Sequence, residues 1–281
     1  MIEAACTVSC LATAVVAGMM AGGVLNLVID HYPVYLYRIW TVEAWEQVGE
    51  RDRAIRLKAA AMPSSVSWDL ACPHCLDAVT GCLNTPLLGY LAHRGRFGCC
   101  KRRVPRRYFL VEGTTAVLWG ASGYVYGIGW DLIPVLFLVC SLVVLGVIDL
   151  EHHILPDQIV CPLMAVGLAV NVQSALAPSI ESALWGAISG YLAFWLVRLG
   201  HLAWRKQEGL GHGDCKLLAG VGAWTGWEML PLAVAVSAAG CLGWCLLMKL
   251  SGQGGKTRGA AFGLWLATGG LCCVYWDSFF G

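Results

Sequence analysis

Long apolar runs, repeated along the chain, constrain its fold more than any other feature of the sequence. A helix that crosses the hydrocarbon core of a bilayer needs about 20 largely apolar residues. Such a run covers 4–29, and further runs, some of them shorter, follow a long polar segment, at 114–130, 132–148, 158–176, 182–199, 215–226, 230–250 and 260–275. These runs predict an all-α polytopic membrane protein with about eight transmembrane helices.

The composition supports the same class. Hydrophobic residues make up 58% of the 281 residues and charged residues 13%, about half the charged share of an average soluble domain. The net charge of +1 gives no overall positive field to attract nucleic acid. We therefore expect the lipid bilayer, and not nucleic acid, as the surrounding partner.

Basic residues are concentrated in one part of the chain. Twelve of the 19 Lys and Arg lie between positions 38 and 107, in the polar segment that separates the first apolar run from the others. Because basic segments stay in the cytoplasm, we expect a small cytoplasmic domain between helices one and two. The predicted division is a first transmembrane helix at 1–29, this cytoplasmic domain at 30–112 and a membrane core at 113–281.

The remaining charges fix an orientation. If 30–112 is cytoplasmic and eight helices alternate in direction, the connections near 149–157, 199–214 and 250–259 are cytoplasmic too. Every other Lys and Arg falls in or beside these three connections. The connections on the opposite side contain only acidic charges, namely Asp131, Glu181, Glu228 and Asp277. This division follows the positive-inside rule and predicts that both termini lie outside the cytoplasm.

Two aspartates come to the same membrane depth in this topology. Asp149 ends the apolar run 142–148, and Asp214 follows the glycine-rich stretch 209–213 just before another apolar run. An ionisable group at such a depth is costly and is a functional hypothesis by default. The structural alternatives are that Asp149 ends a helix at the water line and that Asp214 is a helix N-cap.

A pair of neighbouring carboxyls suggests a specific reaction. Two close carboxyls cannot comfortably both ionise, so they share a proton. The ionised member can accept a proton from water as the water attacks a peptide carbonyl, and the protonated member can donate to the carbonyl oxygen. We therefore predict an aspartyl peptidase with Asp149 and Asp214 as catalytic residues, which needs no metal for proteolysis.

Five short motifs, in order, carry a resemblance to a known family. They lie at 22–33, at 72–75 with 84–90, at 107–112, at 148–157 and at 209–216. In this order they resemble the prepilin peptidases, or type IV leader peptidases, which are membrane aspartyl proteases of the GxGD type. The resemblance implies that Asp149 and Asp214 are catalytic. It also implies type IV prepilins or type II secretion pseudopilins as substrates, cleaved at the cytoplasmic face of the bacterial inner membrane.

Further residues of these motifs are candidates for supporting the substrate or the active site. They are Gly209, Gly211, Gly213, Lys216, Glu112 and Glu151. The alternative for Lys216 and Glu112 is a charge at a helix end, and for Glu151 an interfacial residue. Asp157, after Pro156, is expected to begin the fourth helix, because proline and an acidic side chain both suit a helix N-terminus.

The polar segment contains cysteines that suggest a metal site. Cys72 and Cys75 have a zinc-knuckle spacing, and in a reducing compartment metal is favoured over a disulfide. The resemblance implies a second C-x-x-C motif, but Phe97 takes the place of its first cysteine. A shift of the loop would give the set Cys72, Cys75, Cys99 and Cys100, with Cys82 or His74 as substitutes. The alternative is a loop that folds without zinc.

The resemblance also implies a second activity. Many members of the family methylate the new N-terminal residue of the pilin with S-adenosylmethionine, and the long cysteine-bearing segment favours this activity here. Two other functions stay open from the residues alone. Intramembrane carboxylates also serve as proton relays in transporters, and a noncatalytic scaffold of a secretion machine would carry both aspartates without needing either.

Overall fold

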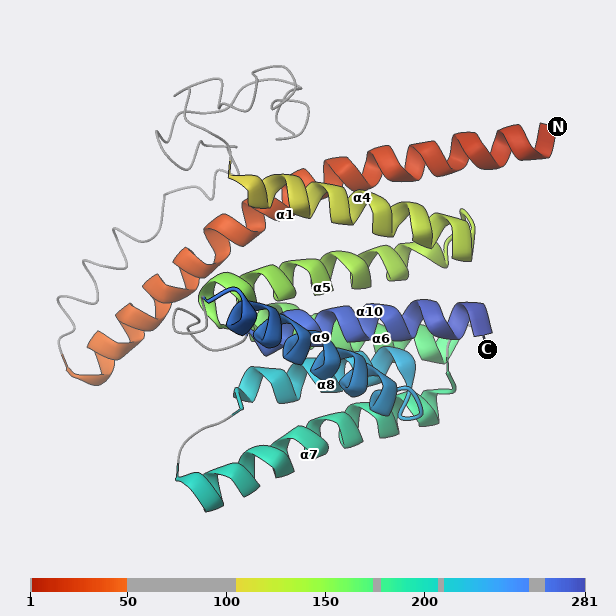
Figure 1. The fold of residues 1–281 in the computed structure, drawn as a ribbon. Coiled ribbons are helices and arrows are strands. Elements are labelled where there is room, and N and C mark those ends of the chain that lie inside the picture. The colour runs from red at the N-terminus through yellow and green to blue at the C-terminus, as the bar shows by residue number, and fades with distance from the viewer. Residues whose placement is uncertain (1, 50–104, 174–177, 207–209, 253–260, 281) are drawn as a thin grey trace, which may run out of the picture. The chain divides into compact units, whose positions relative to one another are not determined.

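The computed structural model describes residues 2–49, 105–173, 178–206, 210–252 and 261–280, and all the regular structure in these ranges is helical. Four of the helices are long and apolar enough to cross a membrane, and two shorter ones are also apolar. The prediction of an all-α polytopic membrane protein is confirmed at this level. In chain order the helices are α1 (Ile2–Gln47), α4 (Arg106–Tyr126), α5 (Leu132–His152), α6 (Asp157–Gln173), α7 (Ile180–Arg205), α8 (His212–Thr225), α9 (Leu230–Leu250) and α10 (Phe262–Phe280) (Figure 1).

Most helices are longer than the apolar runs that predicted them, α1 and α7 by the largest margins. Helix α1 continues from the predicted end at Ile29 to Gln47 and contains Pro33, and α7 continues past the predicted end at Leu199 to Arg205. The apolar runs mark where a bilayer would end. They do not mark the end of a helix, because the hydrogen bonds of a helix join backbone groups and can continue beyond an apolar run.

The chain divides into two compact units. The larger unit contains residues 1–12 and 118–281, and the smaller unit contains residues 13–117. Both predicted catalytic aspartates are in the larger unit, whereas most of α1 and the first half of α4 are in the smaller unit.

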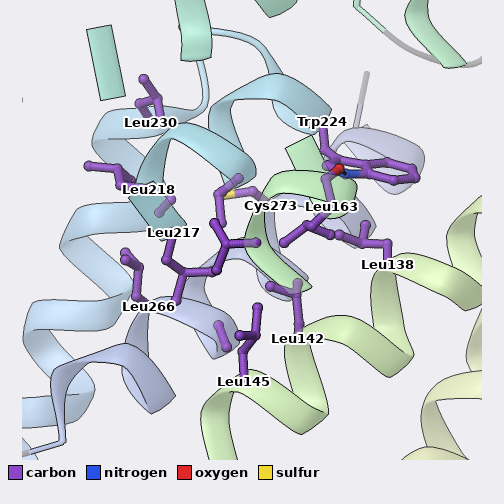
Figure 2. Close-up of a cluster of buried hydrophobic side chains, with 14 of the residues drawn as sticks. Leu138, Leu142, Leu145, Leu163, Leu217, Leu218, Trp224, Leu230, Leu266 and Cys273 are labelled. Carbon is purple, nitrogen blue, oxygen red and sulfur yellow. Dashed lines mark hydrogen bonds between the residues drawn. The ribbon is translucent and has the colours of Figure 1, made fainter. Parts of the chain in front are cut away.

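Helix α8 is the central element of the larger unit. Helices α6, α7, α9 and α10 all contact it, and every residue from Asp214 to Thr225 except Lys216 is buried. Figure 2 shows the core that results, in which leucines of α5, α6, α8, α9 and α10 converge with Trp224 and Cys273. With 14 residues, α8 is about 21 Å long. Because its neighbours pack around this short helix, they also place its first turn.

Close contact between α7 and α8 depends on small residues. A Cβ on Gly186 would collide with the backbone of Gly222, and a Cβ on Gly222 would collide with the backbone of Gly186. One turn further along α7, a Cβ on Gly190 would lie 2.8 Å from the carbonyl oxygen of Leu218. Glycines spaced in this way let two membrane helices approach backbone to backbone.

In the smaller unit, polar side chains join α1 to α4. Arg107 and the hydroxyl of Tyr108 both donate hydrogen bonds to Asp30, and Asn26 Nδ2 donates to the carbonyl oxygen of Tyr108 at 3.2 Å. Burial and the hydrogen bond to Asp30 raise the pKa of Tyr108, so its hydroxyl stays a neutral donor. The motifs at 22–33 and 107–112, far apart in sequence, therefore pack together.

Candidate active site

Asp149 lies at the C-terminal end of α5. The helix ends when His153 takes a left-handed conformation (φ 54°), and the His153 amide donates to the carbonyl oxygen of Asp149 at 2.9 Å. The buried face of α5 includes Leu142, Leu145 and Ile148 and ends with Asp149, which is only 6% exposed. The sequence places this carboxylate at the end of an apolar face, in contact with protein on that side.

Asp214 lies in the first turn of α8 and is 8% exposed. The N-cap of α8 is Gly211, so the alternative that Asp214 is itself the N-cap is wrong. The Asp214 amide donates to the carbonyl oxygen of Gly211 at 3.2 Å, and the Gly211 amide donates to the Asp214 carboxylate. A side chain three residues after the N-cap reaches back in the same way in a capping box, so the helix start orients the carboxylate.

The two carboxylates lie at the ends of helices that share the same neighbours. Helices α5 and α8 both pack against α6 and α10, and the negative charge of Asp149 acts on Asp214. Each carboxylate is more than nine-tenths buried. Two buried carboxylates placed close together can share one proton.

The connection between α5 and α6 packs against the start of α8. A Cβ on Gly213 would lie 2.7 Å from Leu155 Cβ, so Leu155 occupies the space that a side chain at position 213 would need. Pro156, next to Leu155, is buried, and its carbonyl oxygen accepts the amides of Ile159 and Val160 in the first turn of α6. The segment that follows Asp149 and the segment that precedes Asp214 are thus held against each other.

Lys216, a predicted support residue, pairs with the first residue of α6. Its Nζ donates to both carboxylate oxygens of Asp157 at 2.7 Å, with the side chains 30% and 54% exposed, respectively. The prediction that Asp157 begins this helix is confirmed. This ion pair connects α6 to α8 two residues after Asp214.

The N-terminus of α10 also contacts Asp149, a contact that was not predicted from the sequence. The Leu264 amide lies 3.3 Å from Asp149 Oδ2, and the Gly263 amide donates to the same carboxylate. A Cβ on Gly263 would lie 2.8 Å from Oδ2. The only available signal was a glycine in the first turn of the last apolar run.

The structure describes two of the three other predicted support residues. Glu151 is exposed in the last turn of α5. Glu112 is fully buried in the smaller unit, where a Cβ on Gly22 would lie 2.7 Å from its Cα. Gly209 lies outside the described residues. So do the predicted zinc ligands Cys72, Cys75, Cys99 and Cys100 and the proposed substitutes Cys82 and His74. The described residues contain no group of three or more His, Cys, Asp or Glu that could hold a metal.

Comparison with known proteins gives family matches along most of the chain. The bacterial Peptidase A24 N-terminal domain matches residues 16–126, and the type IV leader peptidase family matches residues 136–247. A protein of Stutzerimonas stutzeri is 36% identical over 270 residues, which cover 94% of this chain and 89% of that protein. The chain belongs to the type IV leader peptidase family. It is therefore an enzyme of the peptidase class.

Other members of the leader peptidase family are similarly related. A Pectobacterium carotovorum protein is 36% identical over 94% of this chain and 92% of its own length. One from Pseudomonas aeruginosa is 35% identical over 93% of this chain and 89% of its own length. These two and the Stutzerimonas protein are all named prepilin leader peptidase/N-methyltransferase. No solved structure matches the chain.

Proposed function

We propose that this leader peptidase removes the leader peptides of type IV prepilins or type II secretion pseudopilins, with Asp149 and Asp214 as its catalytic pair. The observation that carries the proposal is the burial of both carboxylates at the ends of α5 and α8, where Leu155, after Asp149, contacts Gly213, next to Asp214. Both lie within the residues that match the peptidase family. The names of the relatives support prepilins as the substrate class.

The pair acts by activating water. The ionised carboxylate accepts a proton as the water oxygen attacks the scissile carbonyl carbon, and the protonated carboxylate donates its proton to the carbonyl oxygen. Collapse of the tetrahedral intermediate breaks the C–N bond. The carboxyl that accepted the water proton gives it to the leaving amine, and a hydroxyl proton of the intermediate returns to the other carboxylate. The products are a free leader carboxylate and a new N-terminus, with one water consumed.

We also propose the predicted topology. The apolar runs predict eight membrane-crossing helices. The distribution of Lys and Arg predicts the orientation, with a cytoplasmic domain at 30–112, both termini outside the cytoplasm and the active site at the cytoplasmic face. The described helices α4 to α10 correspond one by one to the seven later apolar runs, which supports this threading. The inner membrane of a bacterium is the expected location.

A second reaction is proposed for the same chain. The relatives are named as N-methyltransferases as well as peptidases, and the N-terminal domain of the family matches residues 16–126. We infer methylation of the new N-terminal amine with S-adenosylmethionine, whose sulfonium-bound methyl group passes to the amine nitrogen as a proton is lost. The cysteine set at 72, 75, 99 and 100 is proposed to bind zinc in this part of the chain.

The proposal is tested by cleavage of a prepilin-like peptide in detergent by the full-length protein. Asp149→Asn and Asp214→Asn should each lower the rate of cleavage about 100-fold or more, because each removes a proton-transfer group. Asp131→Asn is the matched control, since Asp131 is exposed at the opposite end of α5 and should cleave like wild type. Wild-type rates in either active-site variant would rule out the dyad and favour the transporter or scaffold.

A further inference from the structure

The N-terminus of α10 meets a carboxylate that belongs to another helix. The Gly263 and Leu264 amides, both in the first turn of α10, donate to Asp149 at the end of α5. The first amides of a helix have no partner within the helix and carry its positive partial charge. Ala261, which precedes α10, has no polar side chain to cap them. Asp149 therefore takes the place of a local cap, from a position 115 residues away.

Gly263 is the residue that makes this contact sterically possible. A Cβ at this position would lie 2.8 Å from Asp149 Oδ2 and 2.9 Å from its Cγ. Real Cβ atoms essentially never come this close to another heavy atom. A side chain at position 263 would therefore push the carboxylate away from the α10 amides, or push α10 away from α5.

We propose that the N-terminus of α10 is a third active-site segment, and that Gly263 is a positioning residue for Asp149. The α10 amides hold Oδ2 of the carboxylate, which fixes the side-chain rotation and leaves Oδ1 to meet water and the proton shared with Asp214. Gly263 acts only through Asp149 and does not touch substrate. This inference rests on the proposed role of Asp149 in catalysis.

The consequence for the enzyme is a loss of rate without a loss of binding. A displacement of about 1 Å at a catalytic group can cost about 100-fold in rate. Substrate binding does not use the Asp149 rotation, so the KM for a prepilin-like peptide should change less than about twofold while kcat falls about 100-fold. A purely structural glycine would instead change the amount of folded protein and leave the kcat of the folded fraction close to that of wild type.

Gly146→Ala provides a matched control at the same helix pair. A Cβ on Gly146 would lie 3.0 Å from Leu264 Cδ1, the end of a flexible side chain, and 3.5 Å from Leu264 Cα. It disturbs the α5–α10 contact one turn before Asp149 without approaching the carboxylate. We expect Gly146→Ala to keep kcat within about threefold of wild type, since a mild packing change costs little. An equal loss of kcat in Gly146→Ala and Gly263→Ala would overturn the proposal.

A stability measurement covers the case in which Gly263→Ala is difficult to fold. In the Asp149→Ala background the Oδ2 and Cγ atoms are gone and only the Cβ of residue 149 remains, at 3.2 Å, so a Cβ on Gly263 has more space. Gly263→Ala should lower the Tm of the wild-type protein in detergent but should lower the Tm of Asp149→Ala much less, which is the coupling that a double-mutant cycle detects. Equal decreases in both backgrounds would show that Gly263 meets something other than this carboxylate.

Asp149→Asn in the same cleavage assay separates this proposal from the function on which it rests. Full activity of Asp149→Asn would overturn the aspartyl mechanism. An inactive Asp149→Asn, together with wild-type kcat in Gly263→Ala, would overturn the positioning role alone. The expected result is that Asp149→Asn is inactive and that Gly263→Ala loses kcat with KM retained.

Discussion

Leu155 and Gly213 pack so closely that a Cβ on the glycine would lie 2.7 Å from the Leu155 Cβ. Leu155 belongs to the connection after α5, and Gly213 immediately precedes Asp214. The contact sets how near the segments that contain Asp149 and Asp214 approach each other. Position 213 therefore requires a glycine because Leu155 fills the space of a side chain there, independently of any contact with substrate.

Gly213→Ala should lower the cleavage rate at least tenfold and lower Tm, because overpacking of this kind typically costs about 1–3 kcal/mol and moves the backbone. Leu155→Gly removes the Cβ with which the new methyl group collides. Leu155→Gly/Gly213→Ala should therefore cleave faster than Gly213→Ala alone. Rates and melting curves of the three variants in detergent check this, and wild-type behaviour of Gly213→Ala would contradict it.

The ion pair of Lys216 with Asp157 should matter more for rate than for stability. Partly exposed pairs contribute at most about 1 kcal/mol to folding, so Lys216→Met should change Tm little. It should nevertheless lower kcat several-fold, because the pair holds the first turn of α8 against α6. The exchanged pair, Asp157→Lys with Lys216→Asp, should recover part of the rate. Recovery will be incomplete because a lysine at the first residue of α6 opposes the helix dipole.

Sequence patterns predicted the helices and the two aspartates for different physical reasons. Apolar runs predict membrane helices because a bilayer requires them, and the charge distribution then predicts that Asp149 and Asp214 lie at one depth. The amides of α10 that hold Asp149 could not be predicted, since every residue but proline has an amide. The pairing of Lys216 with Asp157, 59 positions away, requires knowledge of which helices are neighbours. The end of α1 at Gln47 was not predicted, because a helix can continue beyond the end of an apolar run.

Gly186→Ala should destabilise the protein, because its Cβ would collide with the backbone of Gly222 across the α7–α8 contact. Backbone cannot give way as the end of a flexible side chain can, so we expect a decrease in Tm of several degrees. Gly243→Ala in α9 is the control, since a Cβ there meets nothing within 4 Å. Similar melting temperatures for the two variants would be inconsistent with a tight α7–α8 contact.

Zinc binding by the cysteine segment is checked by metal analysis of the purified protein. We expect about one zinc ion per chain, bound by four ligands, and a much lower zinc content in Cys72→Ser. Cleavage of the prepilin-like peptide should be retained in Cys72→Ser, because the aspartate mechanism uses no metal. Wild-type protein without zinc would show that residues 99 and 100 do not complete a site with residues 72 and 75.

The length of α1 determines where the basic segment is attached. Gln47, at the end of the helix, follows Asp30 by 17 residues, or about 25 Å of helix. The chain returns at Arg107, which is bonded to Asp30. Gln47 and the Arg107 contact at Asp30 are thus about 25 Å apart along α1. Pro33 lies between these two points, and proline is where a helix bends most readily, so a bend of α1 at Pro33 would change the distance between them.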